Sequence, residues 1–531
     1  MAHSAAALAA NADRIRRRMK KQMKLNYKRT ILVGFAFFLI SAFWQAYDAI
    51  VPLALTNHFG LPQTISGIVM SIDNVLAVFM LPIFGALSDK VMTKFGRRTP
   101  FIFIGTIAAV LSFILLTVVN GIQIDALMDA GIADSYQSAY DTYTSTVAGL
   151  KDSCDAGSIT EAMKNAGIEE AEATLTAVKT ALRDQALEIT LNNIWPLVGF
   201  VAILLLVLIA MATFRSPAVA LMPDVTIKPL RSKGNAIINL MGTAGGIIVL
   251  LLSNVFGISK NLYMSYTGYV IATCIVMVVG LIIFLTTVKE KKWADEMEEQ
   301  TKALGLEEAP VEENAGAKRT LSKPELRSLL LILASVALWY IGYNSITSKY
   351  SVYSTNVLGV DYGLTLIVAQ AAAIVAYIPV GIVASKFGRR KTILAGITML
   401  ATAFFIGNFI GAGTSNLVMY PIFALAGIGW ATINVNSFPM VVELAKGGEV
   451  GKYTGYYYTA SMAAQIVAPI LSGALYDLFD IITEGNGMRV VFFAFGTIFV
   501  VASFVTMFFV KHGDAKAEKQ NALEALGGAD D

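Results

Sequence analysis

The sequence contains few charged residues, few cysteines and few histidines. Aspartate, glutamate, lysine and arginine make up 15% of its 531 residues, whereas about 25% is usual in soluble globular proteins. The two cysteines, Cys154 and Cys274, and three scattered histidines supply no disulfide framework or metal cluster. Glycine motifs that bind phosphates or dinucleotides are also absent. These absences argue against an enzyme, and we expect no cofactor, no metal site and no nucleic-acid partner.

Hydrophobic residues are abundant instead, at 56% of the chain. They form runs of about 20 residues, and each run is long enough to cross a hydrocarbon layer about 30 Å thick. The first run lacks a small-residue cleavage site, which predicts a retained span rather than a signal peptide. We expect twelve membrane-spanning helices, at about residues 30–56, 64–88, 100–120, 194–222, 235–257, 263–288, 328–350, 363–384, 391–412, 416–442, 453–476 and 488–510.

The lysines and arginines are divided unevenly between the two sides of the membrane. With twelve alternating spans, 33 of the 41 basic residues lie on the side of the N-terminal tail and 7 on the other side, while Arg215 lies within a span. Basic loops tend to stay in the cytoplasm. The sequence therefore predicts a multi-pass protein of the cell membrane, in contact with lipid, with both termini in the cytoplasm.

Two long connections separate the expected spans. The predicted parts are a cytoplasmic basic tail (1–29), an N-terminal six-helix half (30–288) with an extracellular insert (121–190), a cytoplasmic linker (289–325), a C-terminal six-helix half (326–511) and a cytoplasmic tail (512–531). The insert carries 12 acidic and 4 basic residues. Apolar residues at helical spacing predict a small helix that leads into the fourth span: Ile168, Leu175, Val178 and Leu182. The insert is either a solvated cap or an element for gating or partner binding.

A basic hinge occurs twice, each time after the second span of a half. The first copy is GALSDKVMTKFGRRTPF, from Gly85 to Phe101, and the second is GIVASKFGRRK, from Gly381 to Lys391. In the first copy Asp89 stands seven residues before Gly96, about one helical turn more than in the second copy. This repetition indicates a duplicated membrane protein.

Six plus six spans with a basic hinge after spans two and eight resemble the major facilitator superfamily of secondary transporters. The longer first hinge is similar to that of the plant sucrose carriers and the animal proton-associated sugar transporters, which are glycoside–pentoside–hexuronide-like cation symporters. Pro217 and Asp224 fit the family's pattern at the end of span four. The resemblance implies an all-α membrane protein of two pseudo-symmetric six-helix halves, with the helical extracellular insert between spans three and four.

The chain also departs from the relatives that it resembles. Plant sucrose carriers have an arginine and an acid where Val219 and Leu208 stand, and the glycoside–cation symporters have two acids where Ala77 and Leu81 stand. A sodium site of the latter kind is therefore not expected. The proton carrier of the plant proteins cannot be transferred to this sequence.

Three ionisable residues lie well inside the expected spans: Asp48, Asp73 and Arg215. A charge within a span costs several kcal/mol unless it faces a cavity or a partner, so each is a functional candidate. The helical rise places both acids about 12–14 Å below the outer surface and the arginine about 13 Å above the inner one. We expect Asp48 or Asp73 to carry a proton. Arg215 would be its counter-charge or a hydrogen-bond donor to the sugar. The alternative is a structural ion pair that joins helices.

Two helical faces combine aromatic rings with amides, which suits the apolar faces and hydroxyl rim of a sugar. Equivalent positions in spans one and seven supply them, so a ligand between the two halves is expected. The predicted binding residues are Trp44, Gln45, Tyr340, Tyr343 and Asn344, with Asn239, Asn434, Tyr458 and Gln465 as further candidates. Each of the latter four also suits ordinary hydrogen bonding between helices.

The hinges predict a mechanical role at the cytoplasmic ends of the spans. Opposite charges there could latch one half in one orientation and release it in another. The positive-inside rule accounts for some of the arginines, but for neither Asp89 nor the glycines. The expected gating residues are Asp89, Arg97, Arg98 and Asp224 in the first half, and Ser385, Arg389, Arg390 and Glu443 in the second.

These features predict a secondary active transporter that carries a disaccharide or related glycoside with protons, as a monomer, by alternating access. The same fold would serve an exporter of amphipathic compounds by proton antiport. A membrane sensor that binds sugar without moving it is a third interpretation.

Overall fold

The computed structural model describes residues 25–227, 230–258, 262–303, 322–360, 362–411, 414, 416–442, 444, 450–483 and 485–512. Within these ranges the chain is helical throughout, apart from short connections and one isolated bridge between Thr93 and Gly96. Gly96 has a φ of 117° and forms the turn at this bridge, a conformation that favours glycine because it lacks a Cβ atom.

The helices follow one another with short connections. In chain order they are α2 (Tyr27–Val33), α3 (Phe35–Leu53), η1 (Ala54–His58), α4 (Gln63–Lys90), α5 (Thr99–Asp129), α6 (Ile132–Asp155), α7 (Glu161–Asn192), α8 (Trp195–Val225), α9 (Arg231–Val255), α10 (Thr267–Thr287), α11 (Glu290–Ala303), α12 (Lys323–Thr347), α13 (Tyr350–Val352), η3 (Tyr353–Leu358), α14 (Tyr362–Phe387), α15 (Arg389–Gly407), α16 (Asn416–Val442), α17 (Val450–Ile482) and α18 (Gly487–Phe508).

The spans agree in order with the twelve expected from the sequence. Eleven helical segments of the described chain are long and apolar enough to cross a membrane, and a shorter apolar segment, Tyr362–Tyr377, belongs to α14 at the position of the eighth span. The predicted all-α membrane fold of twelve helices is confirmed. Helices α3, α4, α5, α8, α9 and α10 form the N-terminal half, and α12 and α14 to α18 form the C-terminal half.

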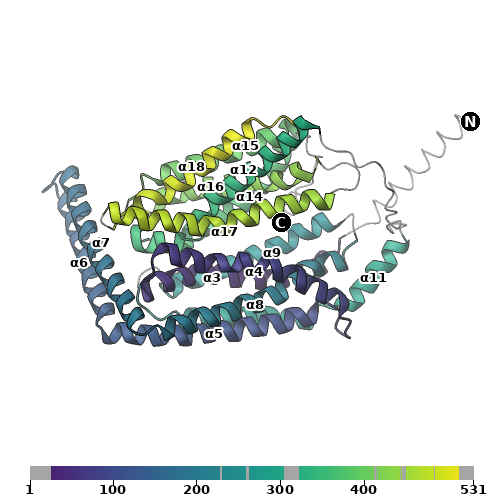
Figure 1. The fold of residues 1–531 in the computed structure, drawn as a ribbon, viewed down its shortest axis with the longest axis horizontal. Helices are drawn as coiled ribbons and strands as arrows, with labels where there is room; N and C mark the ends of the chain where they lie inside the picture. The colour runs from purple at the N-terminus through teal and green to yellow at the C-terminus, as the bar shows by residue number, and fades with distance from the viewer. Residues whose placement is uncertain are drawn as a thin grey trace, which may run out of the picture.

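The two halves lie against each other as two layers, the purple-to-teal N-terminal half below and the green-to-yellow C-terminal half above in Figure 1. Within the first layer α5 packs on α8 and α3 on α9, and within the second α14 and α15 pack on α16 and α12 on α18. Between the layers the main contacts are those of α4 with α17 and of α9 with α14. A central site would therefore be built by helices from both halves.

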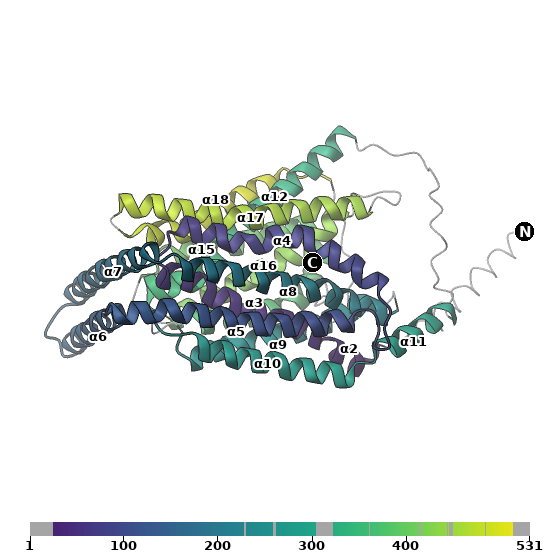
Figure 2. The ribbon, with the colours of Figure 1, turned by 60° about the horizontal axis from the view of Figure 1, so that its bottom comes forward.

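Helices α6 and α7 form a hairpin that projects from one end of the bundle (Figures 1 and 2). We call this the hairpin end, and the opposite end, where Gly96 and α11 lie, the hinge end. The sequence predicted one small helix here, whereas the structure has two long ones and α5 continues to Asp129. Buried polar contacts explain the longer α5, because Gln123 Nε2 donates to the carbonyl oxygen of His58 and to Thr190 Oγ1, each at 2.9 Å.

The two halves are in close contact at the hairpin end. A Cβ atom on Gly67 of α4 would lie 2.1 Å from the carbonyl oxygen of Pro469, and one on Gly473 of α17 would lie 2.3 Å from that of Gln63. These glycines let the two backbones touch. Further along α4, none of residues 72–87 is fully buried. On the α4 side the closest contact between the layers therefore lies at the hairpin end, whereas α9 and α14 also pack together nearer the hinge end, where Ala236 and Val380 belong to one buried cluster.

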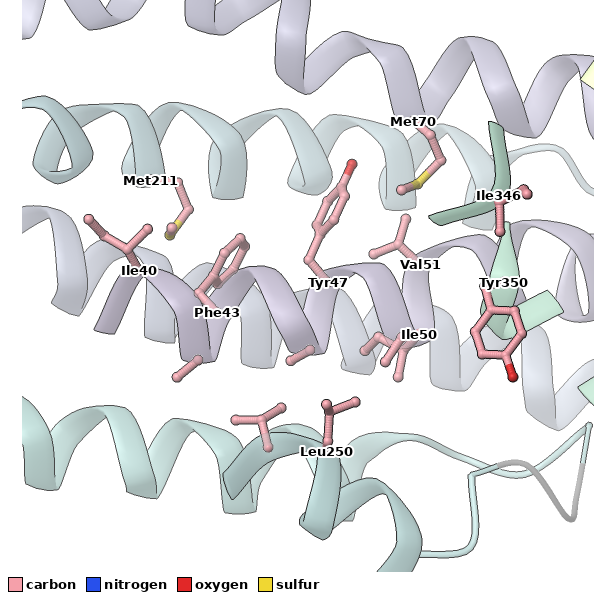
Figure 3. Packing of buried hydrophobic residues seen from close by; sticks show 14 of the residues in the cluster. Ile40, Phe43, Tyr47, Ile50, Val51, Met70, Met211, Leu250, Ile346 and Tyr350 are labelled. Carbon is pink, nitrogen blue, oxygen red and sulfur yellow. The ribbon is translucent and has the colours of Figure 1, made fainter. Parts of the chain in front are cut away.

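Helix α3 crosses the centre of the hydrophobic core. Phe43, Tyr47 and Val51 on this helix have no exposed surface. In Figure 3 the Tyr47 hydroxyl points to the side of α3 where Met70 and Met211 lie, away from Leu250. Tyr47 thus places a polar hydroxyl group within the hydrophobic core, one residue before Asp48.

Helix α11 lies at the hinge end and contacts α8. Arg29 Nη1 of α2 lies 2.5 Å from Glu296 Oε2 of α11, and the Arg29 guanidinium lies 5.2 Å from the centre of the Trp293 ring. The first part of the predicted linker is thus a helix held against the N-terminal half.

Candidate functional site

Asp48 on α3 and Asp73 on α4 occupy the middle of the N-terminal half. Asp48 has exposed surface although its neighbours Tyr47 and Ala49 are buried, and protein surrounds its carboxylate, so the exposed surface belongs to a space inside the bundle. Asp73 is partly buried, and its Oδ1 accepts hydrogen bonds from the backbone N (2.6 Å) and Nδ2 (2.7 Å) of Asn74. The two carboxylates interact electrostatically. Such a pair can share one proton more readily than it can hold two negative charges.

Arg215 on α8 approaches the same region. Its guanidinium lies 5.6 Å from the centre of the Trp44 ring and interacts electrostatically with Asp73. An arginine that lies over an indole ring can still donate hydrogen bonds to oxygen atoms through the N–H groups along the edge of its guanidinium plane. The structure thus brings together the three ionisable residues that the sequence placed inside spans. Their roles in proton movement stay predictions.

The amide of Gln45 links the two halves directly. Its Oε1 accepts a hydrogen bond of 2.9 Å from Nε2 of Gln370 on α14. Sequence analysis missed Gln370, although it is an isolated amide in an apolar run and could have been found by the same criterion as Asn239 and Gln465. A contact between α3 and α14 at this level must change whenever the halves move relative to each other.

The aromatic face of α12 has partners within the C-terminal half. Tyr340 stacks on Trp339 with ring centres 3.9 Å apart, and Tyr343 stacks on Trp430 at 5.8 Å. Nδ2 of Asn344 donates to the carbonyl oxygen of Tyr340 at 2.8 Å. The side chains of Tyr340, Tyr343 and Asn344 are each partly exposed, so they retain surface that a ligand could contact.

The four weaker candidates are distributed over three helices. Asn239 on α9 is buried, and within the described residues neither amide atom of its side chain has a hydrogen-bond partner. Asn434 on α16 is also buried. On α17, Tyr458 packs against Phe438, and Gln465 donates to its own helix at the carbonyl oxygen of Ser461 (3.4 Å). Asn239 therefore has the strongest claim to a ligand or a water molecule, because unpaired buried amides are costly.

The first hinge contains the ion pairs expected of a latch. Arg98 lies 2.8 Å from Asp224 through Nε and 2.5 Å from Asp89 through Nη2, while Arg97 Nε lies 3.4 Å from Asp224. Arg98 also donates to Ser88 Oγ. These contacts join the ends of α4, α5 and α8. The four residues form one network, and whether it gates transport stays a prediction.

Glu290 organises this hinge, and sequence analysis missed it. Its Oε1 accepts from the backbone N of Arg97 (2.7 Å) and of Arg98 (2.8 Å), and its Oε2 accepts from the backbone N and Oγ1 of Thr99, both at 2.7 Å. The carboxylate is buried and satisfies the free N–H groups at the start of α5. A single acid directly after span six, in the run VKEKK, was the available signal.

The second hinge is built differently. Arg390 donates to the carbonyl oxygens of Met507, at 3.4 Å, and Phe508 at the end of α18, and its guanidinium lies 5.8 Å from the Phe508 ring centre. Arg389 begins α15 and Ser385 lies in α14, but the side chain of Ser385 is not described. Glu443 lies outside the described residues. The described contacts tie Arg390 to the end of α18.

A lysine closes the hairpin end between the two halves. Lys349 follows α12 and is fully buried, and its Nζ donates to Oε1 of Gln63 (3.1 Å) and Oγ of Ser66 (2.6 Å) on α4. Asp477 on α17 accepts from the backbone N of Gln63 and of Thr64, each at 2.7 Å. Sequence analysis assigned no role to Lys349 or Asp477, because each stands at the end of a span, where charges are common.

Metal chemistry has no support in the part of the chain that is described. No group of three or more histidine, cysteine or acidic side chains is placed to hold an ion there. Both cysteines are free. The site is therefore composed of carboxylates, one guanidinium, amides and aromatic rings.

Known proteins match this chain at the level of family and fold. Residues 186–376 and 361–528 match the family described as "Major Facilitator Superfamily", and residues 32–124 match the family described as "MFS/sugar transport protein". Human Proton-associated sugar transporter A is 36% identical over 110 residues, and the MFS-type transporter ppzB of Metarhizium rileyi is 29% identical over 100 residues. These alignments cover 21% and 19% of this chain, but only 13% and 20% of the two relatives.

Solved transporters share the fold over nearly the whole chain. The inward-open xylose transporter XylE from E. coli covers 93% of this chain and 98% of its own, with a TM-score of 0.54 and 14% identity. A bacterial homologue of the human drug peptide transporters PepT1 and PepT2 covers 92% and 98%, with a TM-score of 0.55 and 11% identity. Since the superfamily description spans more than half of the sequence and the fold agrees, the chain belongs to the Major Facilitator Superfamily of membrane transporters.

Proposed function

We propose that the protein is a secondary active transporter that carries a disaccharide or related glycoside together with protons. The observation that carries this proposal is the exposure of Asp48, whose carboxylate interacts electrostatically with Asp73, which in turn interacts with Arg215. The partial matches to proton-associated sugar transporters and to the sugar transport description support the choice of substrate class.

The membrane orientation is part of the proposal. The excess of lysine and arginine on the hinge side favours a cytoplasmic hinge end, with both termini in the cytoplasm of a cell-membrane protein. The hairpin then lies outside the cell. In this orientation the contacts at the hairpin end close the outer side, so the proposal takes this state as inward-facing and the protein as a monomer.

Proton coupling follows from the chemistry of the three central residues. When Asp73 is ionised, it interacts with Arg215 and draws that guanidinium away from ligand oxygens. When a proton neutralises Asp73, Arg215 is released to bind a sugar hydroxyl above the Trp44 ring. Asp48, which is accessible in the described state, would take up or release the proton on the open side. Binding of the proton would thus favour binding of the sugar, and release of the proton would favour its release.

The sugar itself would be held between the two aromatic–amide faces. Trp44 and Gln45 belong to the N-terminal half, and Tyr340 and Tyr343 to the C-terminal half, so a ligand between them contacts both halves. The unpaired amide of Asn239 supplies a further donor and acceptor. Alternating access would replace the Gln45–Gln370 hydrogen bond as the halves rock.

Transport into proteoliposomes tests this function. Labelled sucrose or maltose should accumulate when an inward proton gradient is imposed, and an ionophore that collapses the gradient should abolish accumulation. Extrusion of amphipathic compounds without sugar uptake would instead identify a proton antiporter. Sugar binding without counterflow of labelled sugar would identify a sensor.

A further inference from the structure

A cavity of about 460 Å³ lies under the α6–α7 hairpin. The hairpin forms one side of it, and the other side is formed by η3 and by the turn between α17 and α18, both from the C-terminal half. Its floor includes Asn57 and Gln63, directly beside the contacts that close the hairpin end. The volume is in the range of pockets that hold small organic ligands.

The charged side chains that line this cavity are mostly basic. They are Lys151, Lys179, Arg183 and Arg489, against Glu172 and Asp480. Two of the bases are matched by acids: Arg183 Nη1 lies 3.4 Å from Asp480 Oδ2, and Arg489 Nη1 lies 3.8 Å from Glu172 Oε2. The cavity lining therefore carries two more positive than negative charges, although the hairpin as a whole is acidic.

Lys179 is the lysine most enclosed by the cavity wall. Its Nζ donates to the carbonyl oxygen of Asn356 at 2.8 Å, and no carboxylate of the described residues lies within 4 Å of it. Burial lowers the pKa of Lys179 to about 8, while Glu172 acts in the opposite direction. A buried ammonium with so little compensating charge is stabilised when an anion enters the cavity.

The remaining lining suits a ligand with hydroxyl groups. Tyr140 and Tyr143 present rings whose centres lie 6.4 Å apart, and Thr144, Thr176 and Thr180 add hydroxyls. Rings pack against C–H groups, and hydroxyls exchange hydrogen bonds with other hydroxyls. An inorganic ion would use the basic residues but none of these.

We propose that this cavity binds a small polyhydroxy carboxylate at a site separate from the central one. The carboxylate lies near Lys179 and Arg489, where it competes with Glu172, which faces both bases, and the hydroxylated carbon chain lies against the tyrosines and threonines. Lys179 belongs to α7 of the N-terminal half and Arg489 to α18 of the C-terminal half. An occupied cavity therefore bridges the two halves and holds the hairpin end closed.

Thermal unfolding of the full-length protein in nanodiscs tests this site. At pH 7 and low ionic strength, gluconate should raise the melting temperature with a saturable concentration dependence. Sorbitol, which has the same carbon skeleton without the carboxylate, should not. A response to neither compound, or an equal response to both, would overturn the proposal.

Variants locate the binding to the cavity. Lys179→Gln and Arg489→Gln should each weaken gluconate binding about tenfold or more, because each loses one charge-assisted hydrogen bond. Lys179→Arg keeps the charge and should bind within a few-fold of the parent, which separates charge from folding defects. Lys164→Gln is the matched control on α7, since Lys164 is paired with Glu161 at 3.1 Å outside the cavity. Equal weakening in Lys164→Gln would contradict the assignment.

The result is independent of sugar transport. If sugar uptake is intact but gluconate does not bind, only the cavity site is contradicted. If gluconate binds but no sugar is taken up, only the proposed transport function is contradicted.

Discussion

Asp48 and Asp73 differ in their surroundings, although both lie near the middle of their helices. Asp48 is exposed to the accessible space, whereas Asp73 is partly buried, hydrogen-bonded to Asn74 and influenced by Arg215. A group that exchanges protons needs access to water, and a group that senses the exchange needs a charged neighbour. We therefore propose that Asp48 exchanges the proton with water and that Asp73 couples this exchange to Arg215.

Replacing each acid with its amide separates these roles. Asp48→Asn should reduce proton-driven sugar accumulation to the level of protein-free vesicles, while counterflow of labelled sugar continues. Asp73→Asn removes the partner of Arg215, so accumulation should also fall and sugar binding should change. Asp125→Asn, at an exposed acid of α5, is the control and should transport normally. Normal accumulation in both central variants would rule out the carboxylate mechanism.

The two acids of the hinge should also differ in importance. Asp224 is 17% exposed and Asp89 is 58% exposed, although both contact Arg98. Asp224→Asn leaves a nearly buried guanidinium without the more buried of its two acid partners and should lower the free energy of unfolding by about 3 kcal/mol. Asp89→Asn removes a solvent-screened charge and should cost less than about 1 kcal/mol. Thermal or denaturant unfolding in detergent measures both.

Transport kinetics supply the second measurement on these variants. Asp89→Asn should slow transport with little change in sugar affinity, because Asp89 lies far from the central residues. An equal loss of sugar binding would contradict the latch.

At the scale of single elements, the start of α5 depends on a residue far away in the chain. Helix α5 has a proline in its first turn and no side-chain cap of its own. Glu290, from the start of α11, accepts hydrogen bonds from three successive backbone N–H groups there. This acid therefore couples the linker between the halves to the hinge.

Glu290→Gln tests that coupling. The amide keeps an oxygen acceptor but loses the charge at the helix N-terminus, so the free energy of unfolding should fall by about 1–3 kcal/mol. Glu299→Gln, at an exposed position of α11, is the matched control and should have no measurable effect. Equal stability of the two variants would show that the hinge does not need this acid.

The contact of α4 with α17 depends on the absence of side chains. Gly67→Ala would place a methyl group 2.1 Å from the Pro469 carbonyl oxygen, so the closed hairpin end should be destabilised by about 1–3 kcal/mol. In a variant without native cysteines, maleimide labelling of Ser351→Cys, which lies beside α3, should become faster. Gly121→Ala, which has open space around its Cβ position, is the control. Unchanged labelling in Gly67→Ala would contradict a closed end maintained by this contact.

At the scale of the whole molecule, the structure is asymmetric between its ends. Lys349, Gln63 and Asp477 hold the halves together at the hairpin end, and α7 adds contacts to the C-terminal half through Arg183 and Asp480. At the hinge end the described ion pairs join α4, the start of α5 and α8 to one another and α2 to α11. Alternating access requires the hairpin-end contacts to break in the other state.

A cross-link across the hairpin end should stop the transport cycle. Thr64 Oγ1 lies 2.5 Å from Asp477 Oδ2, so cysteines at these two positions can be joined by oxidation or a short thiol-reactive linker. The joined protein should lose both uptake and counterflow, and reduction of a disulfide should restore them. Each single-cysteine variant is a control for the loss of the native contact. Transport that continues after complete cross-linking would exclude opening at this end.

The sequence by itself determined the membrane class, the order of the helices and the polar residues inside them. It could do so because charge is costly in lipid, so Asp48, Asp73 and Arg215 stand out from their apolar runs. Runs of apolar residues likewise mark the spans without any knowledge of packing. The paired hinges were visible because the arginines recur at the same place in each half.

Only the tertiary structure decided which residues hold the molecule in one state. Glu290 contacts residues more than 190 positions earlier, and Lys349 contacts residues more than 280 positions earlier, so neither contact leaves a local pattern. A charge at the end of a span is common and attracts no attention in a sequence. The first helix of the hairpin, α6, was also missed, because it is polar on most of its surface and buries little. Its place over the C-terminal half, and the cavity beneath it, arise from packing between distant segments.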